Sequence, residues 1–391
     1  MPETAYIAHR VFDGTALHDD AALLVKDGRA AAITARDAIP QGVARTDLGP
    51  GIIAPGFVDL QVNGGGGLMF NDAPTVDTLR RMAGALRRLG TTAFLPTLIT
   101  DTPATTRAAI DAAALAVAEG VPGVAGLHLE GPHLSLARKG AHDPALIRPM
   151  RPSDLDMLCD AAARLPNLML TVAPESVTAD QIAALARAGA VVSLGHSDAD
   201  FATCMAAAGA GASCVTHLFN AMSQLSSREP GLVGAALASG GLGAGLIADG
   251  IHVHPAAIAA ALRAKTGPGA VFLVTDAMAT AGSDIDHFTL NGRRIVRRDG
   301  RLTLADGTLA GADLAFPRAL RGRTQAEGGA PDAALAIAAL AMATAGPARV
   351  LRRPGGGGRM QPGGPADFVH LSTGLELLGV WAGGERVASR I

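Results

Sequence analysis

Short apolar runs alternate with longer stretches of mixed polarity from Pro55 to about Val350. Apolar runs of about four to eight residues, bounded by turn-forming residues, are typical of buried strands. We therefore expect eight strands in this region, at Gly56–Val62, Thr92–Leu98, Val124–Leu129, Leu168–Val172, Val191–Leu194, Ser213–Thr216, Gly243–Ile247 and Ala270–Thr275.

The stretches between these strands carry helical patterns. Apolar residues recur about every 3.6 positions over Val76–Leu89, which Gly90 follows as a cap, and over Ala179–Ala188. Pro255 follows His254 at a position suited to the first residue of a further helix. Eight strands that alternate with helices predict an α/β fold, a (β/α)8 TIM-like barrel. A doubly wound open sheet would show the same alternation, so the pattern leaves both architectures open.

The two ends of the chain differ from its middle. The first fifty residues are short apolar segments joined by turns such as Asp27-Gly28, and the tail from Ala366 has the same character. We expect residues 1–54 and 356–391 to form one small β-sandwich domain, and residues 55–355 to form the barrel. A strand–turn–strand pattern over Ile285–Leu309 predicts a β-hairpin inserted after the eighth strand.

Composition and charge exclude several classes of protein. The chain has 391 residues, 49% of them hydrophobic, and a formal net charge of −2, which gives no sign of a nucleic-acid or membrane partner. No segment has the pattern of a signal peptide or a membrane span. Cys159, Cys204 and Cys214 lack the spacing of a disulfide framework, so we expect a cytoplasmic protein. The glycine run Gly355–Gly358 is interpreted as a linker.

Polar residues follow nearly every expected strand. In a barrel, the carboxyl ends of the strands converge on one face, where active sites lie. We therefore interpret these residues as one site. They are Asp59, Gln61, Asn63, His128, Glu130, His196, His217, Asp249, His252 and Asp276.

Two imidazoles and two carboxylates of this set suit metal-assisted hydrolysis. Each alone has an ordinary explanation, because a single histidine is more often structural and a single carboxylate often caps a helix. Together, Glu130, His196 and His217 supply one oxygen and two nitrogen ligands, which suits Zn²⁺ with a position left for water. Fe²⁺, Mn²⁺ or Co²⁺ could occupy the same ligands. Asp276 would then move a proton from that water to a leaving amine.

Two amide side chains of the first strand limit the number of metals. Gln61 and Asn63 alternate with Leu60 and Val62, so they face the same side of the strand as Asp59. Neutral amides are poor Zn²⁺ ligands compared with imidazole. We therefore expect one divalent metal per chain, with this strand orienting the water or the substrate.

Nine segments, in this order and spacing, resemble the N-acetylglucosamine-6-phosphate deacetylases of the amidohydrolase superfamily. The resemblance covers nearly the whole chain, and the combination of segments makes it specific. The segments are Pro55–Gly64, Gly126–Pro132, Lys139–His142, Gly195–Ser197, Thr216–Met222, Arg228–Gly231, Ala248–His252, Thr275–Ala277 and Leu309–Gly311.

The resemblance implies a role for each matched residue. Glu130, His196 and His217 would hold the metal, Asp276 would be the general base and acid, and His142 would help the metal polarise the acetamide carbonyl. The phosphorylated sugar would be bound by residues from several loops, namely Ala141, His142, Asn220, Ala221, Arg228, His252, Leu309, Ala310 and Gly311. The phosphate-binding Arg and His of this family are associated with a dimer interface, so a homodimer is implied.

The implied reaction is hydrolysis of N-acetyl-D-glucosamine 6-phosphate to D-glucosamine 6-phosphate and acetate. Two alternatives stay open: a deacetylase of another phosphosugar, such as the galactosamine epimer, and a non-catalytic scaffold with the amidohydrolase fold. Two features depart from the family pattern. His133 stands where an apolar residue is common, and the loop Ala277–His287 belongs to a segment of variable length and content.

Overall fold

The computed structural model describes residues 3–328, 333–352 and 357–388, and its middle is a parallel sheet of eight strands. The hydrogen-bonded order β15-β14-β13-β12-β11-β10-β9-β6 places each strand beside the next one in the sequence. Each strand overlaps one of the eight predicted from the apolar runs. The strands are β6 (Phe57–Val62), β9 (Thr91–Ile99), β10 (Leu127–Glu130), β11 (Leu168–Val172), β12 (Val191–Leu194), β13 (Cys214–Val215), β14 (Gly243–Leu246) and β15 (Val271–Leu273).

The sheet closes on itself where its first strand meets the segment that follows its last strand. The backbone N–H of Asp276 donates to the carbonyl of Gln61 over 2.9 Å, and the N–H of Asn63 donates to the carbonyl of Ala277 over 2.7 Å. A doubly wound open sheet has no such contact between its two edges. The predicted (β/α)8 TIM-like barrel is therefore confirmed.

A buried carboxylate reinforces this closure. Asp59 on β6 is fully buried and accepts hydrogen bonds from both the hydroxyl and the backbone N–H of Thr275, the latter over 3.2 Å. Burial raises the pKa of Asp59 to about 7, although these hydrogen bonds act in the opposite direction. Asp59 therefore links β6 to the segment after β15. It lies within β6, before the carboxyl end of the strand.

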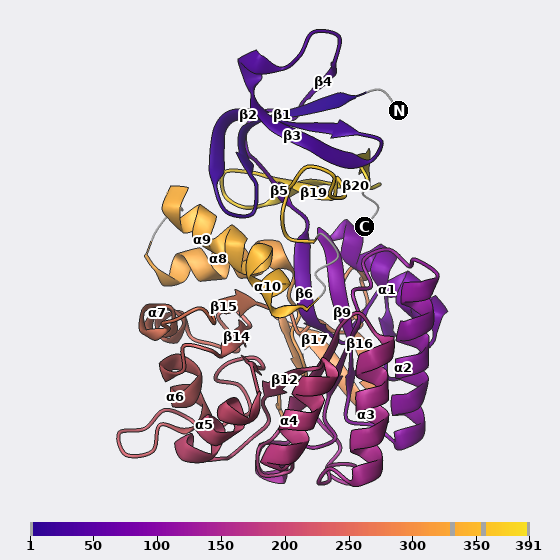
Figure 1. The fold of residues 1–391 in the computed structure, drawn as a ribbon, viewed down its shortest axis with the longest axis vertical. Coiled ribbons are helices and arrows are strands. Elements are labelled where there is room, and N and C mark those ends of the chain that lie inside the picture. Colours follow the sequence, from indigo (N-terminus) through magenta and orange to yellow (C-terminus); the bar gives the residue numbers. More distant parts are fainter. Residues whose placement is uncertain (1–2, 329–332, 353–356, 389–391) are drawn as a thin grey trace.

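Helices cover the outside of the barrel, and most of them pack against the next helix in the sequence (Figure 1). The predicted amphipathic stretches coincide with α1, α4 and α7, and Gly90 after α1 has the positive φ of 91° expected of a residue that ends a helix. The helices are α1 (Val76–Arg88), α2 (Pro103–Ala118), α3 (Pro152–Arg164), α4 (Ala179–Ala188), α5 (Phe201–Ala210), α6 (Gly231–Ala238), α7 (Pro255–Ala264), α8 (Phe316–Ala326), α9 (Ala333–Ala343), α10 (Ala345–Val350) and the short 3-10 turns η1 (Arg36–Ala38) and η2 (Leu136–Arg138).

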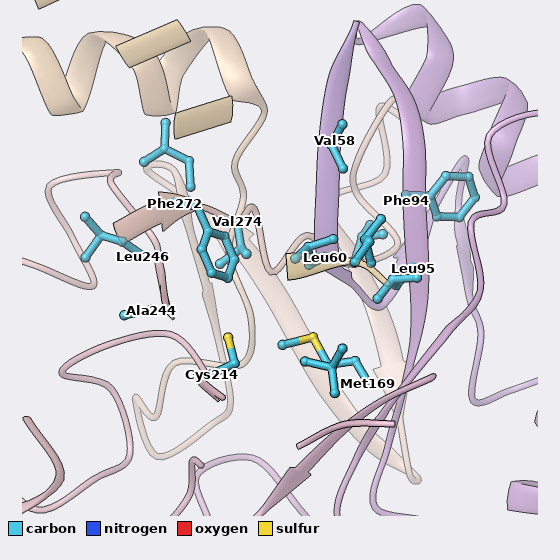
Figure 2. Close-up of a cluster of buried hydrophobic side chains, with 14 of the residues drawn as sticks. Val58, Leu60, Phe94, Leu95, Met169, Cys214, Ala244, Leu246, Phe272 and Val274 are labelled. Carbon is cyan, nitrogen blue, oxygen red and sulfur yellow. The ribbon is translucent and has the colours of Figure 1, made fainter. Parts of the chain in front are cut away.

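Buried side chains of the strands form one extensive apolar cluster. Figure 2 shows Leu60, Met169, Leu246 and Phe272 of four different strands within this cluster, and each is at most 4% exposed. The three cysteines are all unpaired. None of the helices in the described ranges is long and apolar enough to span a bilayer.

The two ends of the chain form a second sheet, which confirms the predicted small β domain built from both ends. Its order is β21-β20-β19-β5-β1-β2-β3, with β4 beside β1, and β5 from the first part of the chain pairs antiparallel with β19 from the last part (Figure 1). The strands are β1 (Thr4–Phe12), β2 (Leu17–Lys26), β3 (Arg29–Ala35), β4 (Ala44–Asp47), β5 (Ile52–Pro55), β19 (Phe368–Leu371), β20 (Leu377–Ala382) and β21 (Glu385–Arg386).

The expected domain boundary between residues 355 and 356 falls outside the described residues, as does the first half of the glycine run interpreted as a linker. At the other boundary the chain is continuous from β5 into β6, separated only by Gly56. The small sheet therefore lies at the amino end of β6, and the carboxyl ends of the barrel strands lie away from it.

Two smaller sheets lie at the carboxyl ends of the barrel strands. The segment after β15 folds into an antiparallel sheet of β16 (His287–Leu290), β17 (Arg293–Arg298) and β18 (Arg301–Thr303), joined by turns whose central residues have positive φ. The first glycine run forms the tight turn between β7 (Gly64–Gly65) and β8 (Leu68–Met69), with positive φ at its third and fourth glycines.

Truncation of a barrel side chain should destabilise the protein strongly. Phe272 is 1% exposed, so Phe272→Ala is expected to lower the free energy of unfolding by about 3–5 kcal/mol through lost apolar burial and a cavity. Chemical denaturation would measure the change. Leu115 on α2 is 50% exposed, and Leu115→Ala is the control, with a change within about 0.5 kcal/mol. Equal effects of both substitutions would contradict this account of the core.

Candidate active site

Three side chains from three strand ends bring their donor atoms together. The Nε2 atoms of His196 and His217 lie 3.0 Å apart, and they lie 3.2 Å and 3.1 Å from Oε1 of Glu130. All three side chains are buried. Tetrahedral zinc, with bonds of about 2.0–2.1 Å, keeps its ligand atoms roughly 3.3 Å apart, which is close to this triangle. The three residues therefore fit a single divalent cation.

The two histidine rings differ in what they contact on the side away from the triangle. Nδ1 of His196 lies 2.8 Å from the carbonyl oxygen of Arg138, which can only accept, so Nδ1 carries a proton and Nε2 is the nitrogen that would bind a metal. Nδ1 of His217 is buried, and no hydrogen-bond partner for it is found in the described part of the chain. His196 and His217 have positive φ values of 47° and 28°, which are uncommon for residues other than glycine and recur at functional sites.

The charge of Glu130 requires positive partners. Burial raises the pKa of this carboxyl, but the hydrogen bonds and charges of His196 and His217 outweigh that effect and hold the pKa well below its usual range. A carboxylate that stays ionised while buried is a suitable ligand for a cation. The electrostatics and the geometry of the triangle therefore favour the same use of these residues.

His142 lies next to the triangle. Its ring also comes within 4.8 Å of ligand atoms of Glu130 and His196, but its Nε2 is 4.0 Å from Oε2 of Glu130, so it fits the inner triangle less well than His217 does. The backbone N–H of Thr100 donates to Nδ1 of His142 over 3.3 Å, and a backbone N–H can only donate. Nδ1 is therefore the acceptor, and Nε2 of the neutral ring carries the proton on the side of the cavity.

Asp276 lies at the closure of the barrel and lines the same cavity. Its Oδ1 accepts hydrogen bonds from the side-chain amides of Asn63 (2.7 Å) and Gln61 (3.3 Å). Burial first, and then the negative charge of Glu130, raise the pKa of Asp276 to about 6. A carboxyl with a pKa near neutrality is suited both to accept and to donate a proton.

A cavity of about 380 Å³ opens at these residues, which is the size of a small-molecule site. Most of the residues expected to contact a substrate line it, namely Ala141, His142, Asn220, Ala221, His252, Leu309 and Gly311. Ala310 is buried and does not line the cavity. Arg228 is exposed and also lies outside the cavity of this single chain.

His252 is oriented by a neighbouring carboxylate. Its Nδ1 lies 2.7 Å from Oδ2 of Asp249, while Oδ1 of Asp249 accepts the backbone N–H groups of Ile251 and His252, each over 2.8 Å. This arrangement places a proton on Nδ1 and leaves Nε2 for a ligand. The strand-end residues Asp249 and His252 thus form a pair at the wall of the cavity.

The remaining strand-end histidine and the unusual His133 lie outside the cavity. His128 is fully buried between the hydroxyls of Thr97 and Thr171, at 3.1 Å and 2.7 Å, and burial lowers its pKa to about 4. His133 bonds through Nδ1 to the carbonyl of Arg148 over 3.1 Å. Both are histidines with structural hydrogen bonds.

Sequence reasoning missed contributors from two parts of the chain. Thr100 directly follows β9, so the rule that polar residues at strand ends form the site would have found it. Arg293 on β17 donates a hydrogen bond to the carbonyl of Ala141, and Leu290 of β16 lines the cavity, so the inserted sheet packs against the site. No pattern in the sequence marks that contact.

Residues 52–387 match the amidohydrolase family. The chain is 47% identical over 339 residues to an N-acetylgalactosamine-6-phosphate deacetylase of Shewanella sp. (strain ANA-3), covering 86% of this chain and 84% of that protein. It is 38% identical over 359 residues to the N-acetylglucosamine-6-phosphate deacetylase of Homo sapiens, covering 88% and 85%. The crystal structure of N-acetylglucosamine-6-phosphate deacetylase from Pasteurella multocida superposes with a TM-score of 0.92 at 34% identity, covering 99% and 100%. The chain therefore belongs to the amidohydrolase family, and within it to the deacetylases of N-acetyl amino-sugar 6-phosphates.

Proposed function

We propose that this protein hydrolyses N-acetyl-D-glucosamine 6-phosphate to D-glucosamine 6-phosphate and acetate. The observation that carries the proposal is the buried triangle of Glu130, His196 and His217 beside Asp276 in one cavity. The names of the relatives supply the substrate class. A non-catalytic scaffold would be expected to lack a ligand or the base, whereas all four residues are present here.

The triangle would hold one divalent cation, most suitably Zn²⁺, which would supply Lewis-acid polarisation of the amide and a more acidic water. The residues of the chain supply the rest. Asp276 takes a proton from the water that adds to the acetyl carbon, and it returns that proton to the nitrogen as the C–N bond breaks. His142 donates from Nε2 to the carbonyl oxygen as negative charge develops there. The products are acetate and the free amine.

The phosphorylated sugar would occupy the wall formed by Asn220, Ala221 and His252. His252, whose Nδ1 is held by Asp249, would contact the phosphate through Nε2. Arg228 is exposed in the single chain and could make paired hydrogen bonds to a phosphate from a second copy. We therefore propose a homodimer in which Arg228 completes the phosphate site. Because the three cysteines are free, we also propose that the protein is cytoplasmic.

A second candidate substrate is the galactosamine epimer. The relative with 47% identity is named for N-acetylgalactosamine 6-phosphate, and it covers most of both chains. The two sugars differ in the orientation of one hydroxyl, which a few contacts in the cavity discriminate. The chemistry at Asp276 and the ligand triangle is the same for both.

Comparison of the two epimers tests the substrate assignment. Acetate release should give a higher kcat/KM for N-acetylglucosamine 6-phosphate than for N-acetylgalactosamine 6-phosphate. Unphosphorylated N-acetylglucosamine is the control and should be a far poorer substrate, because it lacks the phosphate that Arg228 and His252 would bind. Turnover of the galactosamine form alone would replace the first assignment with the second.

Loss of the proton-transfer group should abolish turnover without loss of the metal site. Asp276→Asn is expected to lower kcat by about 100- to 10,000-fold, because an amide cannot accept the proton. Elemental analysis of the same sample should show the metal content of the wild type. Full deacetylase activity in this variant would remove Asp276 from the proposed role.

Removal of the metal should abolish activity reversibly. Elemental analysis of the wild type is expected to give one equivalent of divalent metal per chain, and treatment with a chelator should remove metal and activity together. His196→Ala should lose both for the same reason, since one of three ligands is gone. Two tightly bound equivalents per chain would contradict the single site.

A further inference from the structure

Two amide side chains of β6 contact the carboxylates of the site. Nε2 of Gln61 donates to Oε1 of Glu130 over 3.1 Å and to Oδ1 of Asp276 over 3.3 Å. Nδ2 of Asn63 donates to the same Oδ1 over 2.7 Å and to the carbonyl of Ala277 over 3.5 Å. Gln61 is 2% exposed and Asn63 is fully buried. Each amide nitrogen therefore uses both of its hydrogens within the protein.

The chemistry of the partners fixes the orientation of Asn63. Ionised carboxylates and carbonyls only accept hydrogen bonds, so the nitrogen of the amide must face Asp276 and Ala277. Its oxygen, Oδ1, then lies on the other side, where it is buried and has no partner among the residues that the structure describes. Asn63 lines the cavity, although this oxygen is itself buried.

Both amides bind the same oxygen of Asp276. Within the described residues no hydrogen bond reaches the other oxygen, Oδ2. We propose that Asn63, supported by Gln61, is a positioning residue that fixes the carboxylate of Asp276 through Oδ1 and leaves Oδ2 as the atom that accepts and returns the proton. The inference rests on the proposed deacetylation. It assigns a role to Asn63 and Gln61, which contact Asp276 and not the reacting atoms of the substrate.

Glutamine suits its position for a specific reason. Glu130 and Asp276 are two buried carboxylates that both lie within hydrogen-bond distance of Nε2 of Gln61. A single amide nitrogen with two hydrogens can bond to both, whereas a ring nitrogen of histidine carries at most one. Gln61 therefore joins the ligand triangle to the base through hydrogen bonds from one uncharged donor, in a barrel that is expected to hold one metal.

The substitution Asn63→Leu tests the proposal, because leucine has a similar size and no donor. We expect kcat of the metal-loaded enzyme to fall by about 10- to 100-fold, as for other residues that orient a catalytic group. KM for N-acetylglucosamine 6-phosphate and the affinity for Zn²⁺, measured by competition with a chelating dye, should stay within about threefold of wild type. This split between kcat and KM would not follow from a general loss of structure.

A buried asparagine elsewhere provides the matched control. Asn167 is 2% exposed at the opposite end of the barrel, and its Nδ2 donates to the carbonyl of Ala125 over 2.7 Å. Asn167→Leu should lower Tm without a change in kcat. If Asn63→Leu keeps the kcat of the wild type, or loses activity only in step with metal content, the inference is wrong.

Asn63→Ala keeps the test decisive if leucine is not tolerated at this position. In a crystal structure of the metal-loaded Asn63→Ala protein, the carboxylate of Asp276 should rotate from its wild-type position. A carboxylate that stays in place would overturn the inference whatever the activity. A wild-type enzyme inactive on both epimers would instead contradict the proposed function, while the position of Asp276 would still decide this inference.

Discussion

The closure of the barrel is the constraint on which the site depends. Two backbone hydrogen bonds join β6 to the segment after β15, from Asp276 to Gln61 and from Asn63 to Ala277. They place the first strand of the barrel in contact with the segment after its last strand, although the bonded residues are more than 200 positions apart in the chain. Because each bond includes a residue that lines the cavity, Asp276 or Asn63, the contact that completes the fold also places the base beside the amides that bind it.

Charge is the second constraint, since the site buries two carboxylates within an apolar barrel. Glu130 remains ionised because His196 and His217 lie against it, and a cation bound by these three residues would act in the same direction. Asp276 accepts hydrogen bonds from two amides, and burial together with the charge of Glu130 raises its pKa. Two carboxyl groups of one cavity thus differ in their environments, which separates a ligand from a proton carrier.

Local pattern predicted much of the fold because parallel strands buried on both faces are continuous apolar runs. Strands β11 and β12 begin and end where the sequence predicts. Helices with a polar stripe, such as α1 and α4, were also visible. The alanine-rich α9 carries no such stripe, because alanine occupies its buried and its exposed positions alike, so its sequence shows no periodicity.

The sequence by itself determined which residues belong to the site. Polar residues at the ends of apolar strands are local features, and they can be recognised whether the parallel sheet is open or closed. Glu130, His196, His217 and Asp276 could be named in this way. Only the tertiary structure decided that the sheet closes, that Asn63 faces Asp276 with its nitrogen, and that Arg293 reaches Ala141 from the inserted sheet. These contacts join residues distant in the chain, and their geometry depends on strand register and curvature, which no local pattern of polarity encodes.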